Sequence, residues 1–312
     1  MNVRGALLGT MLLCCAVVVA SSPATSTAEP AGRNDYADAR FTSALGAGLE
    51  YFYAERFEEA QAGFARALQI VPSNVLAMTF LDASAAHRLG ALDAVTSAAE
   101  DAVADAPKSY VDHVRLGFAY LFASHAGRDR TQDARDEFNA AEALDPGAAE
   151  AHVGLGIMRF DERSTNRSKV EFLRALRADP SDVLAREYLG QLYQTDLHDP
   201  QRGLSYVIDI PNLVPQYADI DFHIGSLLWD LHQSAAAIDY LQRGIALDRS
   251  HVGEAGQHGY TLIARIEIEQ GRYADAKSEL AAALAADVDT IYARTLLAKV
   301  RDAAPRPSPS PQ

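Results

Sequence analysis

The chain has 312 residues, a formal net charge of −14 and 48% hydrophobic residues. That length allows one large domain or two small ones. The acidic charge argues against nucleic acid as a partner, because phosphate backbones would be repelled and we find no basic stripe to offset the repulsion. Alanine is abundant, whereas β-branched and aromatic residues are scattered and few runs alternate with period two, which favours an all-α fold.

The first residues have the pattern of a secretory signal. Arg4 provides a short basic region, an uncharged apolar run extends from Gly5 to Ala20, and Ala20 is a small residue at the cleavage position, with Ala28 as a later option. We therefore predict a signal peptide over 1–20 and an exported protein, periplasmic or secreted. A retained membrane anchor is the alternative, but the apolar run is short for a span, so we expect no stable membrane span after cleavage.

Cys14 and Cys15, the only cysteines, both lie inside this apolar run. A bacterial lipoprotein would have small residues before the cysteine, and Leu12 and Leu13 precede the pair here, which disfavours lipid anchoring. Cleavage after Ala20 leaves a mature protein without thiols, disulfides or a thiolate metal site. Residues 21–40 are interpreted as a polar linker.

Three stretches that follow share one spacing of small, aromatic and proline residues. The first carries Gly48, Tyr51, Ala60, Phe64, Ala67 and Pro72; the second carries Leu116, Gly117, Tyr120, Ala134, Phe138, Ala141 and Pro146; the third carries Leu155, Gly156, Ser168, Phe172, Ala175 and Pro180. These stretches resemble the tetratricopeptide repeat, a unit of about 34 residues with the pattern Leu-Gly-x-x-Tyr, Ala-x-x-x-Phe-x-x-Ala and Pro. Weaker copies fill the gaps, which gives units at 41–74, 76–109, 110–148, 149–182, 183–217, 218–251 and 257–290.

Each unit is expected to be a pair of antiparallel helices. Small residues such as Gly117 and Ala134 let two backbones approach closely, while Phe138 and Ala141 share one helix face because they are three residues apart. Pro146 ends the second helix. No unit can bury both of its faces alone, so stability must come from stacking. An irregular helical bundle with coincidental alanine spacing is the alternative.

The resemblance implies a right-handed α-solenoid of about seven helix pairs over 41–290. Residues 291–304 are then expected to form a terminal capping helix with a wet outer face, and 305–312 a disordered Pro/Ser tail. Pro211 falls inside an expected second helix, which must therefore kink or end near Ile210.

No catalytic motif is found. Phosphate loops, HExxH and Gly-x-Ser-x-Gly are missing, and the histidines are dispersed along the chain. His251 and His258 could share a helix face and bind zinc, but two solvated or packed histidines are the simpler interpretation. We therefore expect no enzyme activity, no cofactor and no metal.

The resemblance further implies that the first helix of each pair lines a concave groove that holds a ligand. Carried over by register, the groove residues are Leu49, Phe52, Tyr53, Phe80, His87, Arg88, Phe118, Leu121, Phe122, Ile157, Phe160, Gln191, Phe222 and Trp229. Adaptors of this family that clamp a terminal carboxylate use Lys, Arg and Asn here, and Arg88 is the main cation available, so an apolar helical or extended peptide fits better. Trp229 is the best single anchor. The alternative is that these aromatic residues pack between helices.

These observations predict a non-catalytic scaffold or adaptor of the cell envelope that binds a protein or peptide segment. The first alternative is a structural protein that self-assembles into homo-oligomers through the groove or the last helix. The second is an enzyme, or an accessory to one, that uses the repeats as a platform.

Overall fold

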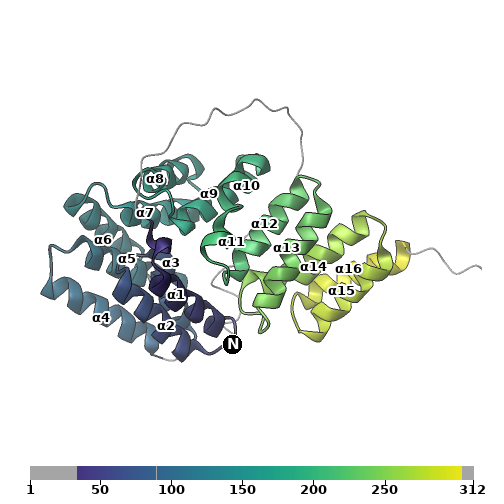
Figure 1. Cartoon of the computed structure of the whole chain (residues 1–312), viewed down its shortest axis with the longest axis horizontal. Coiled ribbons are helices and arrows are strands. Elements are labelled where there is room, and N and C mark those ends of the chain that lie inside the picture. Colours follow the sequence, from purple (N-terminus) through teal and green to yellow (C-terminus); the bar gives the residue numbers. More distant parts are fainter. Residues whose placement is uncertain (1–33, 89, 304–312) are drawn as a thin grey trace, which may run out of the picture. The chain divides into compact units, whose positions relative to one another are not determined.

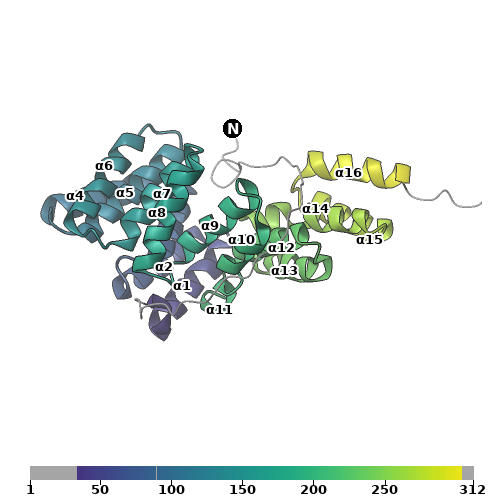
Figure 2. The ribbon, with the colours of Figure 1, turned by 90° about the horizontal axis from the view of Figure 1, so that it is seen from above.

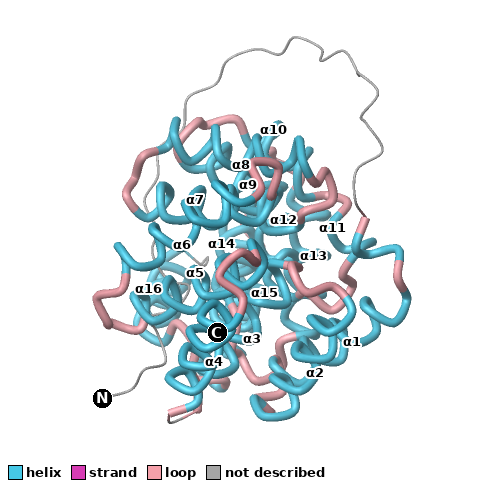
Figure 3. Tube along the Cα trace, turned by 90° about the vertical axis from the view of Figure 1, so that its left-hand side faces the viewer, coloured by secondary structure: helices cyan, strands magenta, loops and turns pink. Residues whose placement is uncertain are grey.

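A computed structural model describes residues 34–88 and 90–303. The expected signal at 1–20 with Cys14 and Cys15, most of the linker and the tail at 305–312 lie outside the described residues. Within the described part every regular element is a helix (Figure 3), which confirms the all-α fold. None of the described helices has the length and apolar character needed to cross a membrane.

Residues 34–38 and 71–185 form one compact unit, called here unit 1. Its helices (Figure 1) are η1 (Asp35–Ala37), α3 (Val75–Ala86), α4 (Ala91–Asp105), α5 (Tyr110–His125), α6 (Thr131–Leu144), α7 (Ala149–Asp161), α8 (Thr165–Ala178) and the start of α9 (Val183–Thr195). The pairs α5–α6 and α7–α8 pack tightly within this unit, and α6 packs on α7, so consecutive pairs stack.

Residues 39–70 and 186–303 form the second compact unit, unit 2. It contains α1 (Ala39–Phe52), α2 (Phe57–Ile70), the rest of α9, α10 (Pro200–Val207), α11 (Ile210–Leu213), α12 (Ala218–Asp230), α13 (Ser234–Leu247), α14 (Glu254–Glu269), α15 (Tyr273–Ala285) and α16 (Thr290–Ala303). Figure 2 shows α14, α15 and α16 side by side. The helix pairs and the additional last helix confirm the solenoid architecture.

The residues that define the repeat spacing form the core. On α6 the fully buried side chains are Ala134, Phe138 and Ala141, the positions singled out by the pattern. On α8 the same places are held by Ser168, Phe172 and Ala175, and the Ser168 hydroxyl donates to the Gly156 carbonyl oxygen at 2.9 Å. Burying each phenylalanine stabilises the fold by roughly 1.5–3 kcal/mol.

The first pair approaches closely because both helices carry glycine where they cross. A Cβ atom on Gly63 of α2 would lie 2.7 Å from the Gly48 Cα of α1. No side chain fits at that distance, so the two backbones touch directly. The pair α1–α2 groups with unit 2 and not with the α3–α4 pair that follows it in sequence.

Pro211 breaks its helix as expected. The helix α10 ends at Val207, two residues lie between, and α11 begins at Ile210 with the proline in its first turn. Proline is tolerated there because the first helical N–H groups have no intrahelical acceptor.

The last helix, α16, covers the end of its unit. Its Ala293, Leu296 and Val300 pack into a cluster with residues of α14 and α15, such as Ala264 and Leu280. On its other side Ile291 is 83% exposed. One buried and one wet face are what a terminal cap of a repeat array requires.

Candidate protein-binding face

The structure buries most of the predicted groove residues in the packing between helices. Less than a tenth of the surface is exposed for Leu49, Phe52, Tyr53, Phe80, Phe118, Leu121, Phe122 and Ile157. Phe118, for example, meets Phe138 edge to face with ring centroids 5.0 Å apart. The remaining candidates keep exposed surface: His87, Arg88, Phe160, Gln191, Phe222 and Trp229.

In unit 1 the first helices of neighbouring pairs are joined by ion pairs. Arg115 of α5 donates to both oxygens of Asp82 on α3, at 2.8 and 2.9 Å. His125 at the end of α5 lies 2.9 Å from Asp161 of α7. These contacts hold α3, α5 and α7 in register, and they occupy polar groups that a ligand would otherwise use.

In unit 2 a continuous set of cross-helix contacts joins α9, α12 and α14. We call this surface the α9–α12–α14 face. Gln194 of α9 donates to Ser226 at 2.8 Å and to Asp230 at 2.7 Å, both on α12. Phe222 of α12 lies beside His258 of α14, with ring centroids 6.1 Å apart. The three helices therefore present one surface.

Trp229, the only tryptophan of the chain, lies at one end of this face. Its indole N–H donates to Glu269 of α14 at 2.8 Å. The Arg265 guanidinium lies 4.2 Å from the ring centroid, within the range of a cation–π contact. Two α14 side chains therefore contact Trp229, which is only partly buried.

His223 occupies the centre of the face and is almost fully buried. Its two ring nitrogens lie 3.0 Å from Glu187 of α9 and 2.7 Å from Glu254 of α14. Burial alone lowers the pKa of His223, but the neighbouring Glu254 and Glu187 carboxylates outweigh it and hold the pKa well above its usual value. The charged imidazolium thus links three helices through two carboxylates.

Beside this histidine lies a second buried carboxyl group, Asp219, at the start of α12. It accepts hydrogen bonds from the Tyr53 hydroxyl at 3.2 Å and from the Ala255 backbone N–H at 3.3 Å. Burial, together with the charges of Glu254 and Asp248, raises the pKa of Asp219 to about 8. Asp219 therefore holds its proton to a higher pH than an exposed aspartate does.

The α14 side chains of this face, Glu254, His258, Arg265 and Glu269, were missed by the sequence analysis, which ended its groove at α12. The sequence holds a signal for them, because Gly271 and Tyr273 mark the following turn and place these residues on the first helix of the last pair. The turn between α13 and α14 is fixed by hydrogen bonds: the Asp248 carboxylate accepts the backbone N–H groups of Val252, Gly253 and Gly256.

The face combines aromatic rings with amide and charged side chains. Across the described ranges, no group of three or more His, Cys, Asp or Glu side chains is placed to hold a metal ion. His258, half of the zinc pair considered from the sequence, instead contacts Asp289 at 3.0 Å.

One helix of this face, α12, lies in a segment that matches a known family. Residues 221–251, which contain most of α12 and all of α13, match the tetratricopeptide repeat family. The chain therefore contains a tetratricopeptide repeat. This match confirms the family resemblance that the repeated spacing predicted.

Two solved structures share the fold of this tetratricopeptide repeat protein. YrrB, described as a TPR protein with an unusual peptide-binding site, aligns with a TM-score of 0.50 and 18% identity over 64% of this chain and 97% of YrrB. A human IFIT1 dimer with PPP-AAAA aligns with a TM-score of 0.54 and 13% identity over 80% of this chain and 59% of that one. At these identities the likeness concerns the fold alone.

Among curated proteins, the type IV pilus assembly protein PilF of Pseudomonas aeruginosa is similar in sequence. It is 25% identical over 141 residues, which are 44% of this tetratricopeptide repeat protein. The match spans about half of that relative, 53% of its length.

Proposed function

We propose that this tetratricopeptide repeat protein is a non-catalytic scaffold of the cell envelope that binds an apolar segment of a partner protein on the α9–α12–α14 face. The observation that carries the proposal is the pair Phe222 and Trp229. They lie two helical turns apart on α12, on the same side of the helix, and each is only partly buried. Large aromatic side chains of this kind dominate binding energies at protein interfaces.

Polar side chains of the face suit the main chain of such a segment. Gln191 and Gln194 of α9 line the face beside the two rings, and their amides have both donors and acceptors. A bound segment would place apolar side chains on Phe222 and Trp229, while its peptide groups meet the glutamines. The buried His223 and its two carboxylates would keep the three helices from shifting when the segment binds.

Two observations support a location in the envelope. The predicted signal at 1–20 would direct export, and the relative PilF is a pilus assembly protein. On these grounds we propose a periplasmic or secreted location.

The sole tryptophan makes the proposal directly testable, because Trp229 emission reports only on this face. Peptides selected from a random display library against the full chain would be titrated while tryptophan fluorescence is recorded. We expect the selected peptides to be apolar, to shift the Trp229 emission, and to bind at least tenfold more weakly to the Phe222→Ala variant.

Tyr240→Ala is the matched control, since Tyr240 is a partly exposed aromatic residue on the second helix of the same pair. It should leave binding unchanged while helical circular dichroism is retained in both variants. Selected peptides that bind without changing Trp229 emission, and that lose no affinity in Phe222→Ala, would refute the assignment of this face.

A further inference from the structure

One helix of unit 1 is positively charged although the chain as a whole is acidic. α8 carries four cations, Arg167, Lys169, Arg174 and Arg177, against a single carboxylate, Glu171, whereas the whole protein has a net charge of −14. The structure thus corrects the expectation that the chain has no basic stripe. That expectation was based on overall composition, which conceals a local reversal confined to one helix.

The cations are gathered on the exposed side of α8. Arg167, Val170, Arg174 and Arg177 are spaced by three, four and three residues, so they lie along one side of the helix, and each is exposed. Arg167 and Arg177 form no hydrogen bond or ion pair with another described residue, and Arg174 makes only contacts of 3.3 and 3.4 Å with Glu171. Between them Val170 exposes 45% of its surface.

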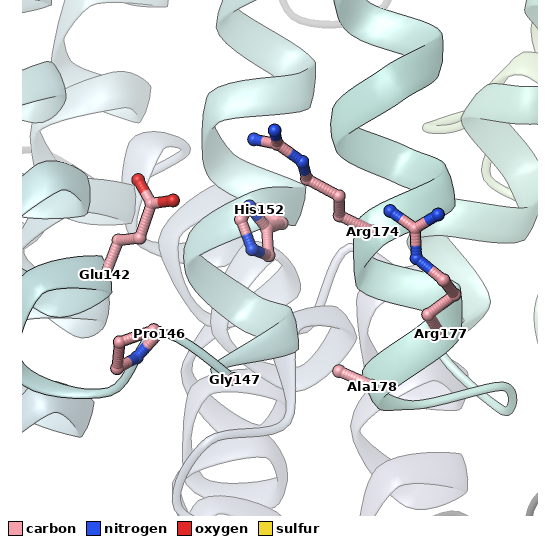
Figure 4. Close-up of a pocket in the computed structure, with 7 residues that line it drawn as sticks. All are labelled: Glu142, Pro146, Gly147, His152, Arg174, Arg177 and Ala178. Atoms are coloured by element: carbon pink, nitrogen blue, oxygen red, sulfur yellow. The ribbon is translucent and has the colours of Figure 1, made fainter.

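A pocket opens at the C-terminal end of this stripe. It has a volume of about 450 Å³ and is lined by Glu142, Pro146, Gly147, His152, Arg174, Arg177 and Ala178. Figure 4 shows the two arginines of α8 on one side, Glu142 of α6 and Pro146 of the following turn on the other, and His152 between them. Leu144 at the end of α6 exposes 42% of its surface. It stands in the sequence between the pocket residues Glu142 and Pro146, so it is a second exposed apolar residue, after Val170, near this site.

We propose that the α8 face, defined as Arg167, Val170, Arg174 and Arg177 with the adjoining pocket, binds an acidic peptide segment of a partner protein. Arg167 and Arg177, which pair with no carboxylate of the described residues, are suited to bidentate pairing with Asp or Glu of a ligand. The exposed Val170 favours a segment that also carries apolar side chains. Glu142 gives the site a direction, because it repels acidic residues at the α6 side of the pocket.

A peptide fits this face better than a nucleic acid. The stripe is about 15 Å long, because ten helical rises separate Arg167 from Arg177. The surrounding chain is acidic: α6, on the other side of the pocket, carries Asp133, Asp136, Glu137 and Glu142 against Arg135. A phosphate backbone longer than the stripe would meet this negative charge.

The test is a peptide selection that includes a counter-selection step. A random peptide display library is panned on the full chain and depleted on the Arg174→Glu/Arg177→Glu double variant, and recovered peptides are measured by fluorescence anisotropy. We expect peptides rich in Asp and Glu that bind the wild-type chain at least tenfold more tightly than the double variant. Their affinity should fall steeply as salt is raised from 50 to 300 mM.

Arg294→Glu/Arg301→Glu on α16 is the matched control, since it makes the same charge change on another exposed helix. It should retain the affinity, and Phe222→Ala should retain it as well, which separates this site from the α9–α12–α14 face. Recovery of no acidic peptide, an equal loss in the α16 control, or tighter binding of a single-stranded oligonucleotide than of the best peptide would each overturn the proposal. Melting curves of all variants confirm that they fold.

Discussion

The Tyr53 hydroxyl, just after α1, donates a hydrogen bond to the Asp219 carboxyl group at the start of α12, across 166 positions of sequence. Tyr53 is 2% exposed and Asp219 is 3% exposed, so water does not replace this bond. The contact joins the first helix pair to the helix that carries Phe222 and Trp229. The first pair therefore supports the proposed binding face although it contributes no exposed residue to it.

Replacing Tyr53 by Phe tests this support. The variant keeps the ring and removes only the donor, so the free energy of unfolding should fall by about 1 kcal/mol, with Asp219 left short of one partner. Urea unfolding followed by circular dichroism measures the change. Tyr240→Phe is the control, because the Tyr240 hydroxyl has no hydrogen-bond partner among the described residues. Equal midpoints for the two variants would contradict a stabilising role for the Tyr53 contact.

The repeat spacing predicted the helix pairs well because it is a local property. Phe138 and Ala141 share a helix face by geometry, and Pro146 ends a helix by its missing N–H, so both outcomes follow from a few neighbouring residues. The break at Pro211 followed for the same reason.

Which helices pack together, and whether the groove residues are buried, depends on contacts between residues that are far apart in the sequence. No local spacing indicates that Tyr53 finds its acceptor in α12. Likewise, Phe118 and Phe122 stand at positions that line a groove in similar proteins, but an aromatic side chain at such a position can equally turn inward, and here both are buried. The basic face of α8 was missed because charge was considered for the whole chain and not helix by helix.

The contribution of Asp182 to stability should decrease as the pH rises from acidic to mildly alkaline values. Burial raises the pKa of Asp182 to about 8, helped by the nearby carboxylates of Asp179, Glu150 and Asp35. In the unfolded chain the group ionises near pH 4, so between these values the folded state holds a proton that the unfolded state has lost. Such a group stabilises the fold fully below the unfolded pKa, and the contribution is lost as the pH rises through the folded pKa.

Asp182→Asn should weaken this pH dependence. The asparagine oxygen can still accept the Ala185 backbone N–H, which lies 2.7 Å from the Asp182 carboxylate at the start of α9. Urea midpoints at pH 5, 7 and 9 should decrease less steeply for Asp182→Asn than for the wild type. Asp239→Asn, at an exposed position of α13, should keep the wild-type slope. Parallel curves for Asp182→Asn and the wild type would rule out this role.

The close approach of α6 and α7 should not tolerate a methyl group at Gly154. A Cβ atom there would lie 2.3 Å from ring atoms of Phe138, which is fully buried. Glycine to alanine in a helix normally stabilises by about 1 kcal/mol, so a clear loss of thermal stability in Gly154→Ala would identify the steric conflict. The double variant Gly154→Ala/Phe138→Leu should recover part of the loss, because the smaller side chain makes room. Losses that simply add in the double variant would show that the two residues do not interact.

The ion pair between Asp82 and Arg115 should be far more costly to break than to replace. Asp82 has no exposed side-chain surface, and Arg115 is 16% exposed at the side chain. Burial raises the pKa of Asp82, and the Arg115 guanidinium opposes this shift. Arg115→Met should therefore leave a buried carboxylate without its cation and lower the free energy of unfolding by about 3–5 kcal/mol. The loss should be larger at pH 8 than at pH 5, where protonation of Asp82 relieves the buried charge.

Asp82→Leu/Arg115→Met, which removes both charges, should be closer to the wild type at both pH values. A double variant as unstable as Arg115→Met would show instead that the shape of the two side chains, and not their charge, holds α3 against α5.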